Sequence, residues 1–279
     1  MSITETAPAK VNLVLRVGEP GPGGLHPLCS LFARIGLADE VTVARSERDE
    51  VVCPGVEGDN LAGRAIRALR EAAGAGVVPP LRVGIVKRIP VAAGLGGGSA
   101  DAAAALRAAN ALAGDPLDRY ALHELARHLG SDVPSQLAPG HAVVSGAGER
   151  VEPVELAPMP LVLIPDREGL ATGAVYARLD RMRAGGQAPP PAGLDPEPLR
   201  CLAGRPPAHL ATRLDNDLQL PALSLRPGLA DRLDAVRERG ALGALVSGAG
   251  PTIFGVFEDR DRAAAAAREI PGALVTEVA

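Results

Sequence analysis

The sequence predicts an α+β fold, and three observations lead to that prediction. Segments that alternate apolar and polar residues, as half-buried strands do, occur in the N-terminal part of the chain, and short strands are expected near the C-terminus. Segments with apolar residues three and four apart, as helices have, lie between and beside them. Strands and helices do not alternate regularly, which favours α+β over a doubly wound parallel sheet. With 279 residues, 47% of them hydrophobic, the chain is long enough for one large or two ordinary domains.

The N-terminal half is predicted to begin with strands and to continue mainly with helices. Strands are predicted over residues 10–17, 40–45 and 81–86, and helices from 61 up to Gly74, over 100–113 and over 118–129. Asp59 and Asn60 offer an N-cap for the first helix, and a glycine follows the end of each helix. The second helix is rich in Ala, which is the best helix former.

The C-terminal half starts at a change in composition. Residues 149–160 form a Pro-interrupted extended segment, which predicts a boundary between an N-terminal domain of residues 1–153 and a C-terminal domain of residues 154–279. Residues 184–198 contain three consecutive prolines and are predicted to form a surface loop. Helices are predicted over 229–238 and 260–269, two short strands within 243–257, and a short strand at the C-terminus.

Composition excludes several classes of protein. Lys plus Arg number 29 and Asp plus Glu 33, so the net charge of −4 argues against nucleic acid as a partner. We expect no membrane partner, because Gly, Pro or charge interrupts every apolar stretch and no export signal is evident. Cys29, Cys53 and Cys201 are scattered, which argues against disulfides or a zinc site and favours the cytoplasm. With only five aromatic residues, the core must be packed from Ala, Leu, Val and Ile.

The most informative segment is the glycine loop, residues 94–99, with the sequence GLGGGS. Glycines leave backbone N–H groups free to converge on an anion, and the helix that follows directs its positive dipole end at the same point. The loop therefore predicts a phosphate site, and a flexible turn is the alternative. It is neither a Walker A loop, because no Lys follows the glycines, nor a dinucleotide fingerprint, because Pro90 interrupts the preceding strand.

Two charged residues could carry phosphoryl-transfer chemistry. Transfer to an alcohol needs a group that orients or deprotonates the hydroxyl and a cation that neutralises developing charge. Asp132, in a Gly-Ser-Asp-Val-Pro segment, and Lys10, on the first predicted strand, would supply these groups. Taken alone, each is more often a surface charge or half of an ordinary ion pair.

Three segments together resemble the signature stretches of one superfamily. They are PAKVNL at residues 8–13, PVAAGLGGGSAD at 90–101 and SGAGPT at 247–252. Their order and spacing are similar to those of the galactokinase, homoserine kinase, mevalonate kinase and phosphomevalonate kinase (GHMP) superfamily. The resemblance implies an ATP-dependent small-molecule kinase with two domains: an N-terminal α/β domain like ribosomal protein S5, carrying the nucleotide and phosphate loop, and a C-terminal ferredoxin-like α+β domain.

Within this superfamily the chain most resembles the branch that acts on a cytidyl diphosphate substrate. That branch phosphorylates the 2-hydroxyl of a methylerythritol derivative in the non-mevalonate route to isoprenoid precursors. The resemblance is carried by AKVNL, by the KRIP segment before the glycine loop and by Gly-x-Asp-Val-Pro at 130–134.

The resemblance also implies roles for individual residues. Lys10 and Asp132 match the catalytic pair. The nucleotide would be bound by Pro90, Val91, Ala92, Ala93, Gly94, Leu95, Gly96, Gly97, Gly98, Ser99 and Ala100, with Asn60 and Lys87 at the adenine. The cytidyl substrate would be bound by Asn12, Leu25, His26, Thr172 and Tyr176. Mg²⁺ would be carried by the nucleotide, with Ser99 as the one side chain that could contact it and no dedicated metal ligand.

Two departures from the pattern concern the substrate. Leu25 stands where an aromatic residue is expected to stack on cytosine, and Ser135-Gln136 stands where an aromatic pair is expected. One alternative function is a kinase of the same superfamily for another alcohol, such as mevalonate or homoserine. The other is a non-catalytic nucleotide-binding regulator, which would not need the Lys10 and Asp132 pair. The protein is expected to be a monomer or a homodimer.

Overall fold

A computed structural model describes residues 1–56, 58–138, 140–166 and 168–278. The chain forms two compact units. The first unit comprises Met1–Ala9, Leu37–Val91 and Gly96–Pro139, and the second comprises Lys10–Gly36, Ala92–Leu95 and Gly140–Ala279. The units are therefore interleaved in the sequence, whereas the predicted boundary after residue 153 is a single cut, and that boundary stays a prediction.

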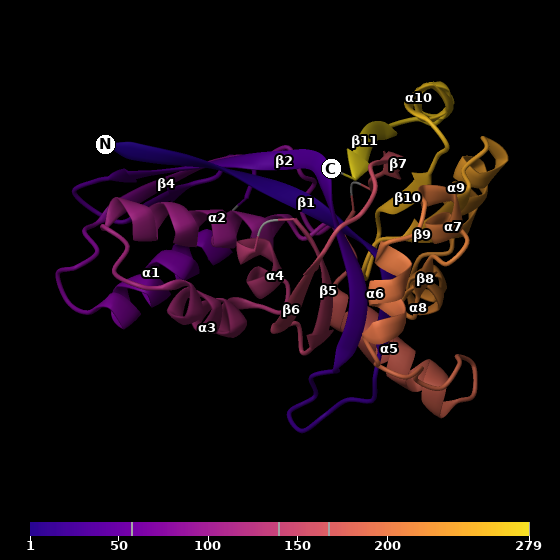
Figure 1. Cartoon of the computed structure of the whole chain (residues 1–279), viewed down its shortest axis with the longest axis horizontal. Coiled ribbons are helices and arrows are strands. Elements are labelled where there is room, and N and C mark those ends of the chain that lie inside the picture. Colours follow the sequence, from indigo (N-terminus) through magenta and orange to yellow (C-terminus); the bar gives the residue numbers. More distant parts are fainter. Residues whose placement is uncertain (57, 139, 167, 279) are drawn as a thin grey trace. The chain divides into compact units, whose positions relative to one another are not determined.

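The first unit is a small sheet covered by helices. The C-terminal part of β2 (Leu28–Arg45) pairs antiparallel with β4 (Leu81–Val86), with Val41 opposite Ile85, and β3 (Glu50–Val52) pairs parallel with β4. The first residues of β1 (Ser2–Val17) also belong to this unit. The helices are α1 (Leu61–Ala73), α2 (Gly97–Leu112), α3 (Arg119–Leu129) and α4 (Val133–Leu137). Figure 1 shows α1, α2 and α3 on the same side of β4.

The core of the first unit is built around the small side chains of α2. This helix buries a continuous run from Ala102 to Leu106 and packs closely against α1, which contributes Ile66 and Leu69. Alanine allows two helix backbones to approach each other, because little side-chain volume separates them. No aromatic side chain belongs to this core among the described residues, as the composition predicts.

The second unit contains two groups of antiparallel strands. In one, the N-terminal part of β2 pairs with β5 (His141–Gly146), and β5 pairs with β6 (Arg150–Val154). In the other, β7 (Met159–Ile164) lies between β11 (Leu274–Val278) and β10 (Ile253–Val256), and β10 also pairs with β9 (Gly243–Val246). β11 reaches β2 through Val278 and Ile35, so the two groups share β2.

The remaining elements of the second unit surround these strands. β8 (Asp215–Asn216) pairs parallel with β1. The helices are α5 (Thr172–Ala184), α6 (Glu197–Ala203), α7 (Pro207–Ala211), α8 (Gln219–Leu225), α9 (Gly228–Glu238) and α10 (Arg260–Glu269). Their apolar residues bury Phe257 together with β-strand residues such as Val162 and Val246. In the described parts of the chain, no helix has the length and apolar character needed to cross a bilayer.

Several predicted elements are confirmed, and three predicted starts lie more than one residue from the observed ones. The strand over 81–86 and the helix over 260–269 have the predicted ends. β1 and β2 begin at Ser2 and Leu28, earlier than predicted. The first residues of β1 include few large apolar side chains, and those of β2 form a buried run without alternation. The helix predicted to start at residue 100 starts at Gly97, so the last glycines of the loop form its first turn. Glycine is a poor helix former, which hides this turn from a propensity argument.

Candidate functional site

The start of α2 presents free backbone donors. Gly96 caps the helix in the left-handed conformation (φ 70°, ψ 15°), and the first intrahelical hydrogen bond runs from the amide of Ala100 to the carbonyl of Gly96 at 2.9 Å. The amides of residues 97–99 therefore have no acceptor within the helix. Three adjacent N–H groups at the positive end of a 16-residue helix are suited to bind an anion. The half-buried hydroxyl of Ser99 has no hydrogen-bond partner in the described part of the chain.

The three signature segments meet in the second unit. The amide of Lys10 donates to the carbonyl of Leu95 at 3.0 Å. The hydroxyl of Ser247 donates to the carbonyl of Gly94 at 3.0 Å, and the amide of Thr252 donates to that of Ala93 at 3.2 Å. The first and third signature segments, which begin near residues 8 and 247, thus fix the conformation of residues 93–95 in the second. Backbone hydrogen bonds of this kind position a loop without using its side chains.

Lys10 and Asn12 form a buried polar pair on β1. The Lys10 ammonium donates to the Asn12 side-chain oxygen at 2.7 Å and lies 5.5 Å from the centre of the Phe32 ring. The Asn12 amide donates to the Ser30 hydroxyl at 2.8 Å, which donates to the carbonyl of Val14 at 2.7 Å. Lys10 is only 4% exposed. This chain of hydrogen bonds orients the ammonium, which a catalytic cation requires.

The turn at residues 247–250 approaches this pair closely. A Cβ atom on Gly248 would lie 3.4 Å from the Lys10 ammonium and 3.3 Å from the Asn12 side-chain oxygen. The buried side chain of Asn216 holds the turn, because its amide donates to the carbonyls of Val246 and Gly248, both at 2.8 Å. A Cβ atom at position 248 would therefore already be in contact with both members of the pair, and the left-handed φ of 56° disfavours any residue other than glycine.

Asp132 is placed in the first unit, whereas Lys10 belongs to the second. It stands at the N-cap of α4, half-buried, and its main-chain carbonyl accepts a hydrogen bond from the Ser135 hydroxyl at 2.8 Å. Its carboxylate does not cap the helix. The carboxylate therefore does not play the helix-capping role that an aspartate at an N-cap usually has.

Lys87 lies in an ion-pair cluster beneath the start of α2. Its ammonium contacts the carboxylates of Asp39 and, at 2.8 Å, Asp101. Asp39 is fully buried and also accepts hydrogen bonds from the amides of Arg88 and Ile89. A Cβ atom on Gly97 would lie 3.2 Å from the Lys87 ammonium. The cluster therefore packs against the first turn of α2 at Gly97.

Charge balance in this cluster shifts the proton affinity of its members. Burial would lower the pKa of Lys87, but hydrogen bonds to Asp101 and Asp39 outweigh burial and raise it. Burial raises the pKa of Asp101 to about 6, although Lys87 opposes the increase. Two carboxylates share one ammonium, so one of them is expected to hold a proton in mildly acidic solution.

We expect this titration to make stability depend on pH. Asp101 has a pKa of about 6 in the folded chain against 3.8 for the free side chain, so the folded state binds the proton more tightly. The contribution of Asp101 to the free energy of unfolding is therefore greatest below pH 3.8 and falls as pH rises towards 6, by at most about 1.4 kcal/mol per pH unit. Urea denaturation of the wild type and of Asp101→Asn across this range tests it. The stability advantage of the wild type should shrink with rising pH; an advantage independent of pH would contradict the assignment.

Asn60, predicted to contact adenine, is the N-cap of α1. Its side-chain oxygen accepts a hydrogen bond from the amide of Ala62 at 2.9 Å. The carboxamide is thus held by its oxygen in a fixed orientation, and its nitrogen carries two further donors. Contact with adenine stays a prediction for both Asn60 and Lys87.

A second cluster of predicted site residues lies around α5. The His26 ring nitrogen Nε2 lies 2.8 Å from an oxygen of Asp180, and the His26 and Tyr176 rings are 5.0 Å apart and tilted by 48°. The structure thus brings two predicted substrate residues together. Thr172, the first residue of α5, is exposed, and Leu25 is 66% exposed. The apolar side chain of Leu25 is therefore available to a ligand rather than packed in the core.

Known proteins are similar to this chain over nearly its whole length. The GHMP kinases N terminal domain matches residues 60–140, and the GHMP kinases C terminal domain matches residues 205–275. A 4-diphosphocytidyl-2-C-methyl-D-erythritol kinase of Streptomyces avermitilis is 42% identical over 97% of this chain and 93% of its own length. This chain belongs to the 4-diphosphocytidyl-2-C-methyl-D-erythritol kinase family. A kinase of the same name from Anaeromyxobacter sp. (strain Fw109-5) is 45% identical over 99% of this chain and 88% of its own.

Membership in the 4-diphosphocytidyl-2-C-methyl-D-erythritol kinase family also agrees with a solved structure. A crystal structure of 4-(cytidine 5'-diphospho)-2C-methyl-D-erythritol kinase, 34% identical, covers 99% of this chain and 100% of its own, with a TM-score of 0.75. The predicted two-domain α+β GHMP kinase fold is therefore confirmed, and the chain is a small-molecule kinase.

The sequence reasoning missed four polar residues that support these clusters. Asp39, Asp101, Asp180 and Asn216 contact predicted site residues or hold the segments that carry them. Asp101 stands at the end of the second signature segment, which is a signal that could have been used. The others lie in ordinary polar sequence, and only the fold brings them to their partners.

Proposed function

We propose that this chain transfers the γ-phosphoryl group of ATP to the 2-hydroxyl of 4-diphosphocytidyl-2-C-methyl-D-erythritol. The observation that carries the proposal is the identity of 42–45% to kinases of that name over nearly the whole chain. The start of α2 supports this proposal, because three free amides and a helix dipole are suited to the phosphates of a nucleoside triphosphate. As a soluble metabolic enzyme with three free cysteines, it would act in the cytoplasm.

Each catalytic residue has a distinct role in this proposal. The Asp132 carboxylate accepts or orients the proton of the acceptor hydroxyl, so that the oxygen can attack the γ-phosphorus. The Lys10 ammonium stabilises negative charge on the transferring phosphoryl group. The ammonium of Lys87 is bound by two carboxylates, so its third N–H donor and the main chain of Lys87 are left to contact adenine.

Mg²⁺ would enter with the nucleotide, where it neutralises phosphate charge. Among the described residues, no group of three or more His, Cys, Asp or Glu side chains could hold a metal ion. Mg²⁺ usually keeps several waters and is bound through phosphates with one or two protein oxygens. The unpaired hydroxyl of Ser99 in the first turn of α2 fits such a contact.

We expect Lys10→Met to lower turnover by roughly 10²–10³, as removal of an electrostatic stabiliser does. Methionine retains an apolar chain beside Phe32 but removes the donor to Asn12. ATP and substrate affinities should change less than turnover. The check is steady-state kinetics beside a thermal melting curve, and a folded variant with wild-type turnover would exclude the role.

The cytidyl end of the substrate would bind at the cluster around α5. We propose that Tyr176 stacks on cytosine and that the exposed Leu25 covers its other face by apolar contact. Asn12, His26 and Thr172 would supply polar contacts. Asp180 holds the His26 ring and so fixes which nitrogen remains for the substrate.

We expect Tyr176→Ala to raise the KM for the cytidyl substrate about tenfold or more, because base–aromatic stacking contributes about 1–3 kcal/mol. The KM for ATP should change little. Tyr176 also packs against the core of the second unit, so the melting temperature should fall modestly. Tyr176→Phe is the matched control, because it keeps the ring. Equal impairment of both substrates by Tyr176→Ala would mean that the tyrosine only supports the core.

The test of the proposed function is a coupled assay for ADP release. The cytidyl methylerythritol, mevalonate and homoserine are offered separately at equal concentration. ADP release that depends on the cytidyl compound supports the proposal, and preference for mevalonate or homoserine would assign another alcohol. Binding of ATP without turnover of any of the three would support a non-catalytic regulator. A monomeric or homodimeric state, and the absence of a nucleic-acid partner, stay predictions.

A further inference from the structure

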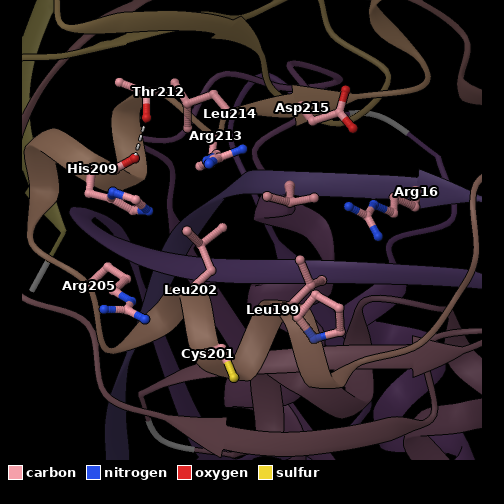
Figure 2. A pocket seen from close by; sticks show the side chains of 12 residues that line it. Arg16, Leu199, Cys201, Leu202, Arg205, His209, Thr212, Arg213, Leu214 and Asp215 are labelled. Carbon is pink, nitrogen blue, oxygen red and sulfur yellow. Dashed lines mark hydrogen bonds between the residues drawn. The ribbon is translucent and has the colours of Figure 1, made fainter.

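The second unit contains a cavity that none of the predicted site residues lines. Its volume is 520 Å³, and it is bounded by α6, α7, the segment that leads into β8, and Val14 and Arg16 of β1. Figure 2 shows Arg16 and Asp215 on one side of the view and Arg205 and His209 on the other. Its volume lies in the range of cavities that bind small organic molecules, about 300–1,000 Å³.

The cavity is rich in positive charge, although the chain as a whole has a net charge of −4. Arg16, Arg205 and Arg213 line it against a single carboxylate, that of Asp215. Within the described ranges, none of the three arginines forms an ion pair. Elsewhere in the same unit, buried or half-buried arginines such as Arg183 are paired with carboxylates.

One of these arginines carries a buried, unsatisfied donor. Arg16 Nε is buried and has no hydrogen-bond partner in the structure. Buried polar atoms are nearly always paired, so a donor of this kind at a cavity wall calls for an acceptor. Arginine suits phosphate in particular, because its planar donors match two phosphate oxygens.

The rest of the wall is apolar. Five apolar side chains line the cavity: Val14, Pro198, Leu199, Leu202 and Leu214. A free phosphate or pyrophosphate ion would use the arginines but would leave this surface in contact with water. A ligand with an apolar carbon chain would bury it and gain hydrophobic free energy.

We propose that this cavity binds a small organic diphosphate whose carbon part is apolar. The diphosphate contacts Arg16, Arg205 and Arg213, and the carbon chain lies against Leu202 and its apolar neighbours. The proposal does not rest on the function proposed above, since no side chain of the cavity has a part in that reaction.

The probe is n-hexyl diphosphate, titrated calorimetrically into the full chain. Inorganic pyrophosphate and n-hexanol are the two comparison ligands. A saturating non-hydrolysable ATP analogue and the cytidyl substrate are present, so that the nucleotide and substrate sites are filled. We expect n-hexyl diphosphate to bind on the order of tenfold more tightly than pyrophosphate, and n-hexanol not to bind detectably. Equal affinity for the two diphosphates, or no binding of n-hexyl diphosphate, would overturn the proposal.

Variants of the rim arginines locate the binding. Arg205 and Arg213 are exposed, so Arg205→Gln and Arg213→Gln should fold normally, which melting curves verify. Each should weaken binding of n-hexyl diphosphate on the order of tenfold, the usual loss for a charged hydrogen bond. Arg268→Gln, an exposed and unpaired arginine of α10, is the matched control and should bind like the wild type. Unchanged binding in the double variant of Arg205 and Arg213 would place the ligand elsewhere and refute the assignment.

Discussion

Asp132→Asn is expected to lower turnover by roughly 10²–10⁴ and to leave ATP affinity nearly unchanged. Asparagine keeps the shape of the side chain but cannot accept the proton of the acceptor hydroxyl, and a positioned acid–base group typically contributes a factor of this size. The hydrogen bond from Ser135 goes to the main chain of residue 132 and is kept in the variant, and a melting curve verifies that the variant folds.

The measurement is single-turnover and steady-state kinetics together with direct ATP binding. Ser131→Ala, a change at the exposed neighbouring residue, is the control and should behave like the wild type. Wild-type turnover in Asp132→Asn would show that the aspartate is structural only. A parallel loss of ATP affinity would place its role at the nucleotide.

Gly94→Ala is expected to disrupt the glycine loop and to destabilise the second unit strongly. Gly94 has a φ of 76°, and a Cβ atom there would lie 2.3 Å from the carbonyl oxygen of Ser247 and 2.8 Å from that of Gly250. Both contacts are with backbone, which cannot move aside as a flexible side chain can. Backbone strain and overpacking each cost about 1–3 kcal/mol, so the free energy of unfolding should fall by about 2–6 kcal/mol.

Gly98→Ala is the matched control for stability. A Cβ atom on Gly98 would meet nothing within 4 Å, and the residue lies in the first turn of α2. Alanine favours a helix over glycine by about 1 kcal/mol, so this variant should be as stable as the wild type or more so. Chemical denaturation of both variants and of the wild type measures their free energies of unfolding. Similar stabilities for Gly94→Ala and Gly98→Ala would mean that the turn at residues 247–250 does not constrain the loop.

Local signals in the sequence were enough to predict an anion site and the elements that present it. Four glycines between a strand and an Ala-rich helix leave backbone amides free, and this consequence depends only on neighbours in the chain. For the same reason, local signals located the N-cap Asn60 and the start of a helix at Asp118, whose side chains bond to amides two or three residues further along. The resemblance of three ordered segments then led to the family.

The side chains that support this segment became evident from the folded chain alone. Lys87 pairs with Asp39, 48 residues earlier in the chain, and Ser247 bonds to Gly94, 153 residues earlier. Contacts between residues so far apart leave no periodicity in the sequence, because they depend on how strands and helices pack rather than on local spacing. The basic cavity beside α6 and α7 likewise arises where β1 meets segments about 190 residues away, so no stretch of sequence contains it.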